Sequence, residues 1–180
     1  MKCLRIMLPV VLISLSAMAF AQSDAEKSFD QMKTLAGTWE GPVVLDPPDP
    51  EMSGGDKPVH VSLRVTSKGN ALVHEMQEAG TPLDATRYDH PVTMFYVDGD
   101  RLLLTHYCDA GNRPRMAGKV SPDGKKVEFD FIDLSGGNQH GHMYHALFTS
   151  VDANHHIEDW TYMMPGDKPM HARMDLRRTK

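Results

Sequence analysis

The stretch that decides the fold is Leu35-Ala36-Gly37-Thr38-Trp39-Glu40-Gly41, which joins a short amphipathic segment to a long run of strand-like sequence. Before it, Phe29 and Met32 recur at the spacing of one helix face. The capping box Ser23-x-x-Glu26 predicts where this helix begins, and Gly37 is placed to end it. The stretch therefore predicts a joint between a short N-terminal helix and a β-domain, with Trp39 packed at the closed end of that domain.

Ten segments after this joint have strand character and are separated by turn sequences such as Asp98-Gly99-Asp100. In the clearest of them, residues 59–65, apolar and polar side chains alternate strictly. The ten segments are residues 38–44, 59–65, 71–77, 92–97, 101–108, 115–121, 126–132, 141–151, 155–163 and 170–178. Consecutive hairpins in one domain favour an all-β fold, an up-and-down antiparallel β-barrel of about nine or ten strands with the helix as a plug. A β-sandwich is the alternative.

Residues 1–21 have the pattern of a secretory signal peptide rather than of a membrane span. A basic start with Lys2 and Arg5 precedes an apolar run, and Ala19-Phe20-Ala21 has the form of a cleavage site. Cleavage there leaves residues 22–180, which have the size of a single domain. We expect an exported protein, periplasmic or secreted, with no stable membrane span after cleavage.

The composition of residues 22–180 excludes some classes of partner. Loss of Lys2 and Arg5 leaves 17 basic residues against 24 acidic ones, a net charge of −7 with histidine neutral. This charge disfavours nucleic acid as a partner. Cys108 is the single cysteine of this part of the sequence, so it has no internal disulfide partner there.

Side chains that share an inward strand face define a candidate ligand pocket. His106 and Cys108 lie on the face of Leu102 and Leu104, which we expect to be the barrel interior, and His74 lies on the face of Leu72. A hydrogen-bonded core histidine beside a buried thiol and a soft-metal or haem ligand pair are both open interpretations. The candidate ligand-binding residues are His74, Met94, Tyr96, His106, Cys108 and Trp160.

Other histidines and methionines have weaker patterns. His140 and His142 share a strand face while His145 points the other way, so the three do not form a convergent zinc site. The pair His155-His156 follows a turn and is expected to be exposed to solvent. Methionines 163, 164, 170 and 174 belong either to a soft pocket wall or to the core.

The opening Leu35-x-Gly37-x-Trp39-x-Gly41 resembles the G-x-W opening of lipocalins and is closer to that of nitrobindin-like haem-binding barrels. The segments 67–75 and 174–178 are similar to a group of secreted bacterial proteins of unknown function. This resemblance implies a calycin-like barrel. It also implies a candidate axial haem ligand, His171, because a histidine stands there a few residues before Leu176-Arg177-Arg178. The alternation of the last strand, however, places His171 with charged residues rather than with the apolar face.

Three functions follow from these observations. The first is a non-enzymatic exported barrel that binds a small apolar or amphipathic molecule. The second is a haem- or metal-binding nitrobindin-like protein that uses His171, His106 or Cys108. The third is an enzyme with its site in the barrel mouth, ranked last because no catalytic pair is identifiable from the sequence.

Overall fold

The computed structural model describes residues 22–48 and 57–179, so the predicted signal peptide lies outside the described residues. In these ranges one helix, α1 (Asp24–Lys33), precedes the strands, and a single 3₁₀ turn lies between two of them at Ser67–Gly69. The strands are β1 (Gly37–Gly41), β2 (Val43–Asp46), β3 (Val59–Thr66), β4 (Ala71–Glu78), β5 (Val92–Asp98), β6 (Arg101–Tyr107), β7 (Arg113–Val120), β8 (Lys126–Ser135), β9 (His142–Asp152), β10 (His155–Met164) and β11 (Lys168–Arg178).

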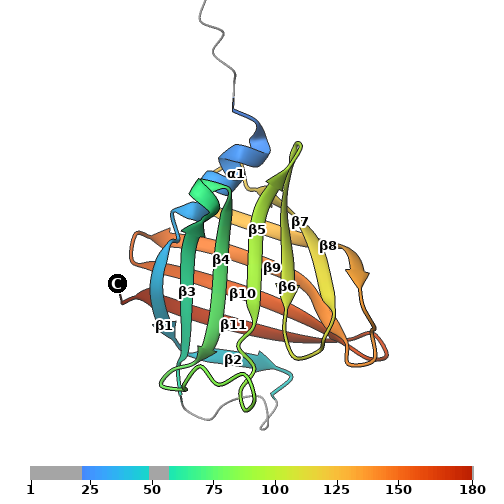
Figure 1. Cartoon of the computed structure of the whole chain (residues 1–180). Helices are drawn as coiled ribbons and strands as arrows, with labels where there is room; N and C mark the ends of the chain where they lie inside the picture. Colours follow the sequence, from blue (N-terminus) through green and yellow to red (C-terminus); the bar gives the residue numbers. More distant parts are fainter. Residues whose placement is uncertain (1–21, 49–56, 180) are drawn as a thin grey trace, which may run out of the picture.

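These strands form one antiparallel sheet that closes on itself (Figure 1). From β3 onward each strand pairs with the next in the chain, and β11 returns to pair with both β1 and β2. β1 and β2 are two halves of one barrel strand, because both pair with β11. The strand is interrupted at Pro42, which lacks the N–H group that a continuous ladder requires. The predicted up-and-down barrel is thus confirmed, with ten barrel strands, and the sandwich is not formed.

α1 begins as the sequence predicts but ends earlier. The Ser23 side chain accepts a hydrogen bond from the Glu26 backbone N–H, and the Glu26 carboxylate accepts one from the Ser23 N–H, which completes the capping box. The helix ends with Thr34 as its C-cap. The prediction that Gly37 ends the helix is wrong: Gly37 starts β1, at a φ of 144° that favours glycine.

α1 lies across one end of the barrel in Figure 1, and its buried residues include Phe29 and Met32. Phe29 and Met32 are buried and belong to the same apolar cluster as residues of the barrel strands. A ten-residue helix is marginal in isolation, so this docking is what keeps it folded. The helix plug that the sequence predicts is therefore confirmed. Among the described residues, no helix has both the length and the apolar character needed to cross a lipid bilayer.

Trp39, on β1, connects the end of the helical segment to the barrel core. Its ring is fully buried, and its Nε1 donates to the Leu35 carbonyl, 2.9 Å away, at the end of the helical segment. The Arg178 guanidinium on β11 lies 4.0 Å from the centroid of the Trp39 ring and donates to the carbonyls of Ala36 and Thr34. Three backbone carbonyls after the helix end thus accept hydrogen bonds from the side chains of one tryptophan and one arginine.

Gly41 permits the close approach of β1 to β11. A Cβ atom at this position would lie 1.8 Å from the carbonyl oxygen of Asp175, far inside van der Waals contact. The motif that opens the barrel thus combines a buried anchor, Trp39, with a residue that has no side chain at the closing seam.

Candidate functional site

A cavity of about 710 Å³ lies at the end of the barrel opposite α1. Its wall is largely apolar and comes from strands that are far apart in the sequence, including β2, β4, β9, β10 and β11. The apolar lining residues are Val43, Leu45, Val59, Met76, Met143, Trp160, Met164, Met170, Ala172 and Met174. Polar side chains on its border include His106, Cys108, Tyr162, Lys57, Glu78, Asp89 and Asp109.

His106, on β6, is a nearly fully buried polar residue on this border. Its Nδ1 lies 2.8 Å from the Thr93 hydroxyl, whereas its Nε2 has no hydrogen-bond partner within the described residues. Burial lowers the pKa of His106 to about 3, and the electrostatic effect of nearby His74 lowers it further. The imidazole is therefore neutral near pH 7, and its Nε2 is a buried polar atom, without a hydrogen-bond partner among the described residues, beside a largely apolar wall.

Cys108 borders the same cavity two residues further along the chain. Burial raises the pKa of its thiol, and the carboxylates of Asp89 and Asp109 raise it further, although a hydrogen bond from the Ala110 backbone opposes them. The thiol is therefore protonated at neutral pH, and its sulfur adds a soft, weakly polar atom to the wall.

Beneath the cavity a second polar group is completely enclosed by the barrel. The Glu158 carboxylate accepts hydrogen bonds from His156 Nε2 at 2.9 Å, from His74 Nε2 at 3.0 Å and from Trp160 Nε1 at 2.9 Å. Glu158 and both histidines have no exposed side-chain surface. Because a carboxylate only accepts, each imidazole donates through its Nε2–H group, and the Nδ1 atoms of both rings have no hydrogen-bond partner among the described residues.

Burial by itself raises the pKa of Glu158, but the charges and hydrogen bonds of His74 and His156 outweigh it and hold the pKa well below the usual range. The carboxylate is thus ionised in the barrel interior. Trp160 connects this cluster to the cavity, because its indole N–H binds Glu158 while its side chain lines the cavity wall. The rings of His106 and His74 each lie 5.7 Å from the Trp160 ring, centroid to centroid.

The structure brings three of the six predicted pocket residues to the cavity: His106, Cys108 and Trp160. His74 is buried behind them in the Glu158 cluster. Met94 and Tyr96 alternate along β5 with the buried residues Thr93 and Phe95 and do not line the cavity, so their assignment to the pocket is corrected. Of the four methionines considered, Met164, Met170 and Met174 line the cavity and Met163 does not.

His156 and Glu158 are the interior residues that the sequence analysis missed. The expectation that His155-His156 is exposed is wrong for His156, which packs edge-on against Trp39 with ring centroids 4.2 Å apart. The alternation His156-x-Glu158-x-Trp160 contained the necessary information, because residues two apart on a strand share a face. Nearness to the turn did not predict exposure of His156, because β10 begins at His155, directly after the turn, and His156 is already within the strand.

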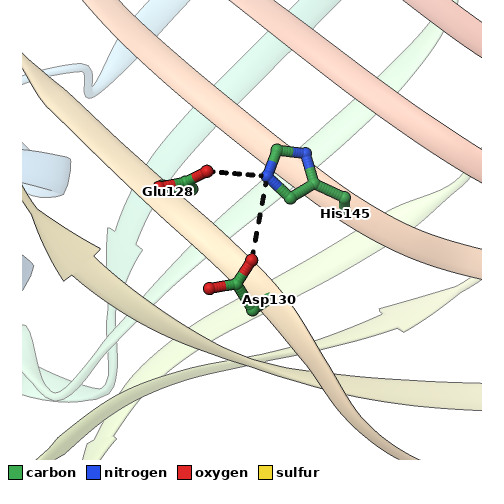
Figure 2. Close-up of side chains that lie close together, drawn as sticks. All are labelled: Glu128, Asp130 and His145. Atoms are coloured by element: carbon green, nitrogen blue, oxygen red, sulfur yellow. Dashed lines mark hydrogen bonds and ion pairs between the residues drawn. The ribbon is translucent and has the colours of Figure 1, made fainter.

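The histidines near residue 140 do not converge. His140 is exposed, and His142 Nδ1 lies 3.0 Å from Asn138 Oδ1. His145 instead faces two carboxylates on β8 (Figure 2), with its Nε2 3.2 Å from Glu128 and 3.9 Å from Asp130. An irregularity in the β9–β10 register, between Thr161 and Tyr162, breaks the simple alternation from which the faces of these residues were predicted.

Within the described residues, the group in Figure 2 is the one set of three His, Cys, Asp or Glu side chains whose ligand atoms all lie within 4.8 Å of one another. Glu128 and Asp130 alternate with the buried Val127 and Phe129, so they lie on the outer wall of the barrel. Lys119 Nζ is 3.1 Å from Asp130 and already supplies positive charge there. These contacts are those of a surface ion-pair network.

His171 does not fit the role of an axial haem ligand. Its side chain is exposed, and its Nδ1 lies 3.0 Å from the hydroxyl of Thr161 on the neighbouring strand. The cavity is lined instead by its neighbours Met170 and Ala172, which point to the other face of β11. A haem held by His171 would therefore lie outside the barrel, away from the dry apolar pocket that haem requires.

No family model matches the sequence, and no curated protein matches it. The structure is similar to the crystal structure of Rv2717c from M. tuberculosis, with a TM-score of 0.60 and 12% identity over 85% of this chain and 98% of that one. A protein of unknown function from the DUF3598 family of Nostoc punctiforme aligns over 82% of this chain and 48% of its own, with 10% identity and a TM-score of 0.42. The chain is thus a ten-strand antiparallel barrel, similar in fold to Rv2717c.

Proposed function

We propose that this protein is a non-enzymatic binding protein that holds one small apolar or amphipathic molecule in the cavity opposite α1. The observation that carries the proposal is the combination of an apolar wall with one unpartnered polar atom, His106 Nε2, at the cavity border. Ligand sites in proteins have this composition, in which apolar surface supplies affinity and a few polar groups fix orientation.

The size of the cavity supports an organic ligand rather than solvent alone. Its 710 Å³ lies within the range of about 300–1,000 Å³ that is usual for small-molecule sites. Methionine side chains contribute much of the wall, and their flexible thioethers adapt to irregular apolar shapes. Met76, Met143, Met170 and Met174 all belong to it.

The polar end of such a ligand would meet His106. Because the ring is neutral, it offers one hydrogen bond without a formal charge, and Thr93 holds it in a fixed orientation. A ligand with an apolar body and one hydrogen-bonding group therefore suits the cavity better than a polyanion does. We further propose that the protein acts outside the cytoplasm, on the basis of the signal-peptide pattern in residues 1–21.

The test uses the neutral apolar fluorophore N-phenyl-1-naphthylamine, titrated into the purified protein. We expect saturable binding at one site, with quenching of Trp160 emission. Substitution Ala172→Phe adds a ring to the cavity wall and should weaken probe binding at least tenfold while the protein stays folded by circular dichroism. Native mass spectrometry of protein from its own host would then identify a retained ligand.

Val44→Phe is the matched control, because Val44 pairs with Arg173 on β11 and is exposed, next to Ala172 but on the other face. Its probe affinity should stay within twofold of the unmodified protein. The proposal would be overturned by the absence of saturable probe binding, or by equal affinities in Ala172→Phe and the unmodified protein.

A further inference from the structure

We propose that His106 and Cys108 form a site for a soft monovalent metal ion, Cu(I), at the inner end of the cavity, completed by methionine thioethers of the wall. The site goes beyond the proposed organic ligand, and it stands on three features of the described residues. These are an orphaned buried imidazole nitrogen, a thiol on the same strand face, and a wall rich in thioether sulfur.

The geometry of His106 is that of a metal-ligating histidine. Such residues bind metal through one ring nitrogen while the other donates its hydrogen to a neighbour, which fixes the tautomer and the ring orientation. Here the Thr93 hydroxyl lies 2.8 Å from Nδ1 and can accept that hydrogen, which leaves the lone pair on Nε2. Nε2 is buried and has no partner, a situation that has a free-energy cost unless something binds it.

Cys108 is placed to act with His106. The two residues are separated by Tyr107, which is exposed, so both side chains turn to the cavity side at the end of β6. Residues two apart on a strand are spaced by roughly 6.6 Å along it, and an ion with two bonds of about 2.0–2.3 Å can bridge side chains that lean together. Asp89 and Asp109, on the same cavity border, add negative charge that favours a cation.

The remaining ligands decide which metal is favoured. Met143, Met170 and Met174 line the same cavity and carry soft thioether sulfurs. Thiolate and thioether ligands select Cu(I), whereas Mg²⁺ and Ca²⁺ require oxygen ligands and structural Zn²⁺ sites use three or four Cys, His or carboxylate ligands. Cu(I) accepts a thiolate, an imidazole and thioether sulfurs together, whereas thioethers are not among the usual ligands of Zn²⁺, so the methionine-rich wall favours Cu(I).

Binding involves proton exchange and no redox change. The Cys108 sulfur exchanges its hydrogen for the ion: the S–H bond breaks, an S–Cu bond forms, and the proton leaves to solvent while copper remains Cu(I). His106 Nε2 and the thioethers donate lone pairs without losing protons. The ion and the hydrogen-bonding group of an organic ligand would compete for the single lone pair of His106 Nε2, so the two are alternative occupants of this part of the cavity.

The test is an anaerobic titration of the purified protein with Cu(I) in the presence of a chromogenic Cu(I) chelator. We expect one ion per chain and an ultraviolet thiolate-to-copper absorption band. Cys108→Ser should abolish the band, and Cys108→Ser and His106→Gln should each weaken binding at least tenfold. Met170→Leu, a conservative change, should weaken it by a smaller factor. Ag(I), a redox-inert ion of the same class, should compete, and Zn²⁺ should not.

Two substitutions serve as matched controls, because they remove the same residue types away from the cavity: His171→Gln and Met94→Leu. Both should bind Cu(I) like the unmodified protein. The proposal is overturned if the chelator retains all the copper, if the band survives in Cys108→Ser, or if the controls lose binding equally. The fluorophore titration contains no metal, so failure of this site leaves the proposed organic ligand untouched, and the reverse also holds.

Discussion

At the scale of single residues, the interior of this barrel is organised around Glu158. An ionised carboxylate without exposed surface is stable only when it is hydrogen-bonded and accompanied by compensating charge. His74, His156 and Trp160 supply three N–H donors from two strands, β4 and β10. The cluster separates the packed end of the barrel, around Trp39, from the end that holds the cavity.

Substitution Glu158→Gln should therefore reduce the free energy of unfolding by about 3 kcal/mol or more, because it leaves two buried imidazoles without their carboxylate. Urea unfolding followed by circular dichroism measures the change. Glu128→Gln is the matched control, since Glu128 binds His145 on the outer wall and should cost less than about 1 kcal/mol. Equal losses of unfolding free energy in the two variants would contradict the claim that the buried Glu158 cluster stabilises the fold more than the surface ion pair does.

The pKa of His106 predicts a dependence of stability on pH. The folded-state pKa of about 3 lies below the ordinary value of 6.5, so the unfolded chain binds a proton that the folded chain does not. This contribution to stability is complete above pH 6.5 and is lost as pH falls toward 3, by up to about 1.4 kcal/mol per pH unit. Glu158, whose pKa is also lowered, adds a loss only below about pH 4.5, its ordinary value.

Unfolding by urea at pH 5.0, 5.5, 6.0, 6.5 and 7.0 is compared between the unmodified protein and His106→Gln, because His142, whose pKa burial also lowers, contributes equally to both. Stability of the unmodified protein should fall through this range as pH decreases, and His106→Gln should show a clearly smaller slope. Parallel slopes in the two proteins would show that His106 is not neutral in the folded state.

At the scale of elements, the seam between β1 and β11 closes the barrel and leaves no room for a side chain at Gly41. We expect Gly41→Ala to lower the free energy of unfolding by about 3 kcal/mol, because the new Cβ atom must push the Asp175 backbone away. The thermal midpoint reports the loss. Val44→Ala, an exposed change on β2, should leave the thermal midpoint nearly unchanged. An unchanged midpoint in Gly41→Ala would contradict the prediction, because it would mean that the backbones of β1 and β11 separate at little cost in free energy.

Element boundaries were well predicted where local patterns decide them. Strict alternation identified β3, and turn sequences such as Asp98-Gly99-Asp100 identified the hairpins. The errors have long-range causes. Arg178 and Trp39 satisfy groups after the end of α1, so the helix ends at Lys33 with no need of Gly37. Pro42 divides the first barrel strand because it lacks an N–H group, and the pairing of both halves with β11 keeps them in one strand of the closed barrel.

At the scale of the whole molecule, the two ends of the barrel have separate roles. α1 plugs one end through Phe29 and Met32, and the cavity occupies the other. We expect Phe29→Ala to reduce the free energy of unfolding by about 3 kcal/mol, because it removes a buried ring from the helix contact. Probe affinity measured on the folded variant should stay within twofold of the unmodified protein.

Ala172→Phe should show the opposite pattern, with a large loss of probe affinity and a small loss of stability. A loss of probe affinity in Phe29→Ala as large as that in Ala172→Phe would show that the two ends are coupled through the Glu158 cluster.

The sequence by itself determined the all-β class, the order of hairpins, the helix plug and the structural role of Trp39, because periodicity, caps and turns are encoded by neighbouring residues. It also placed His106 and Cys108 on one inward face. Alternation along the last strand also placed His171 away from the apolar face. Only the tertiary structure decided that His156 and Glu158 form a buried cluster with His74, and that Met94 and Tyr96 lie away from the cavity. The physical reason is that closing a sheet into a barrel joins side chains more than 80 residues apart, such as His74 and Glu158, and local alternation carries no information about which strands meet across the interior.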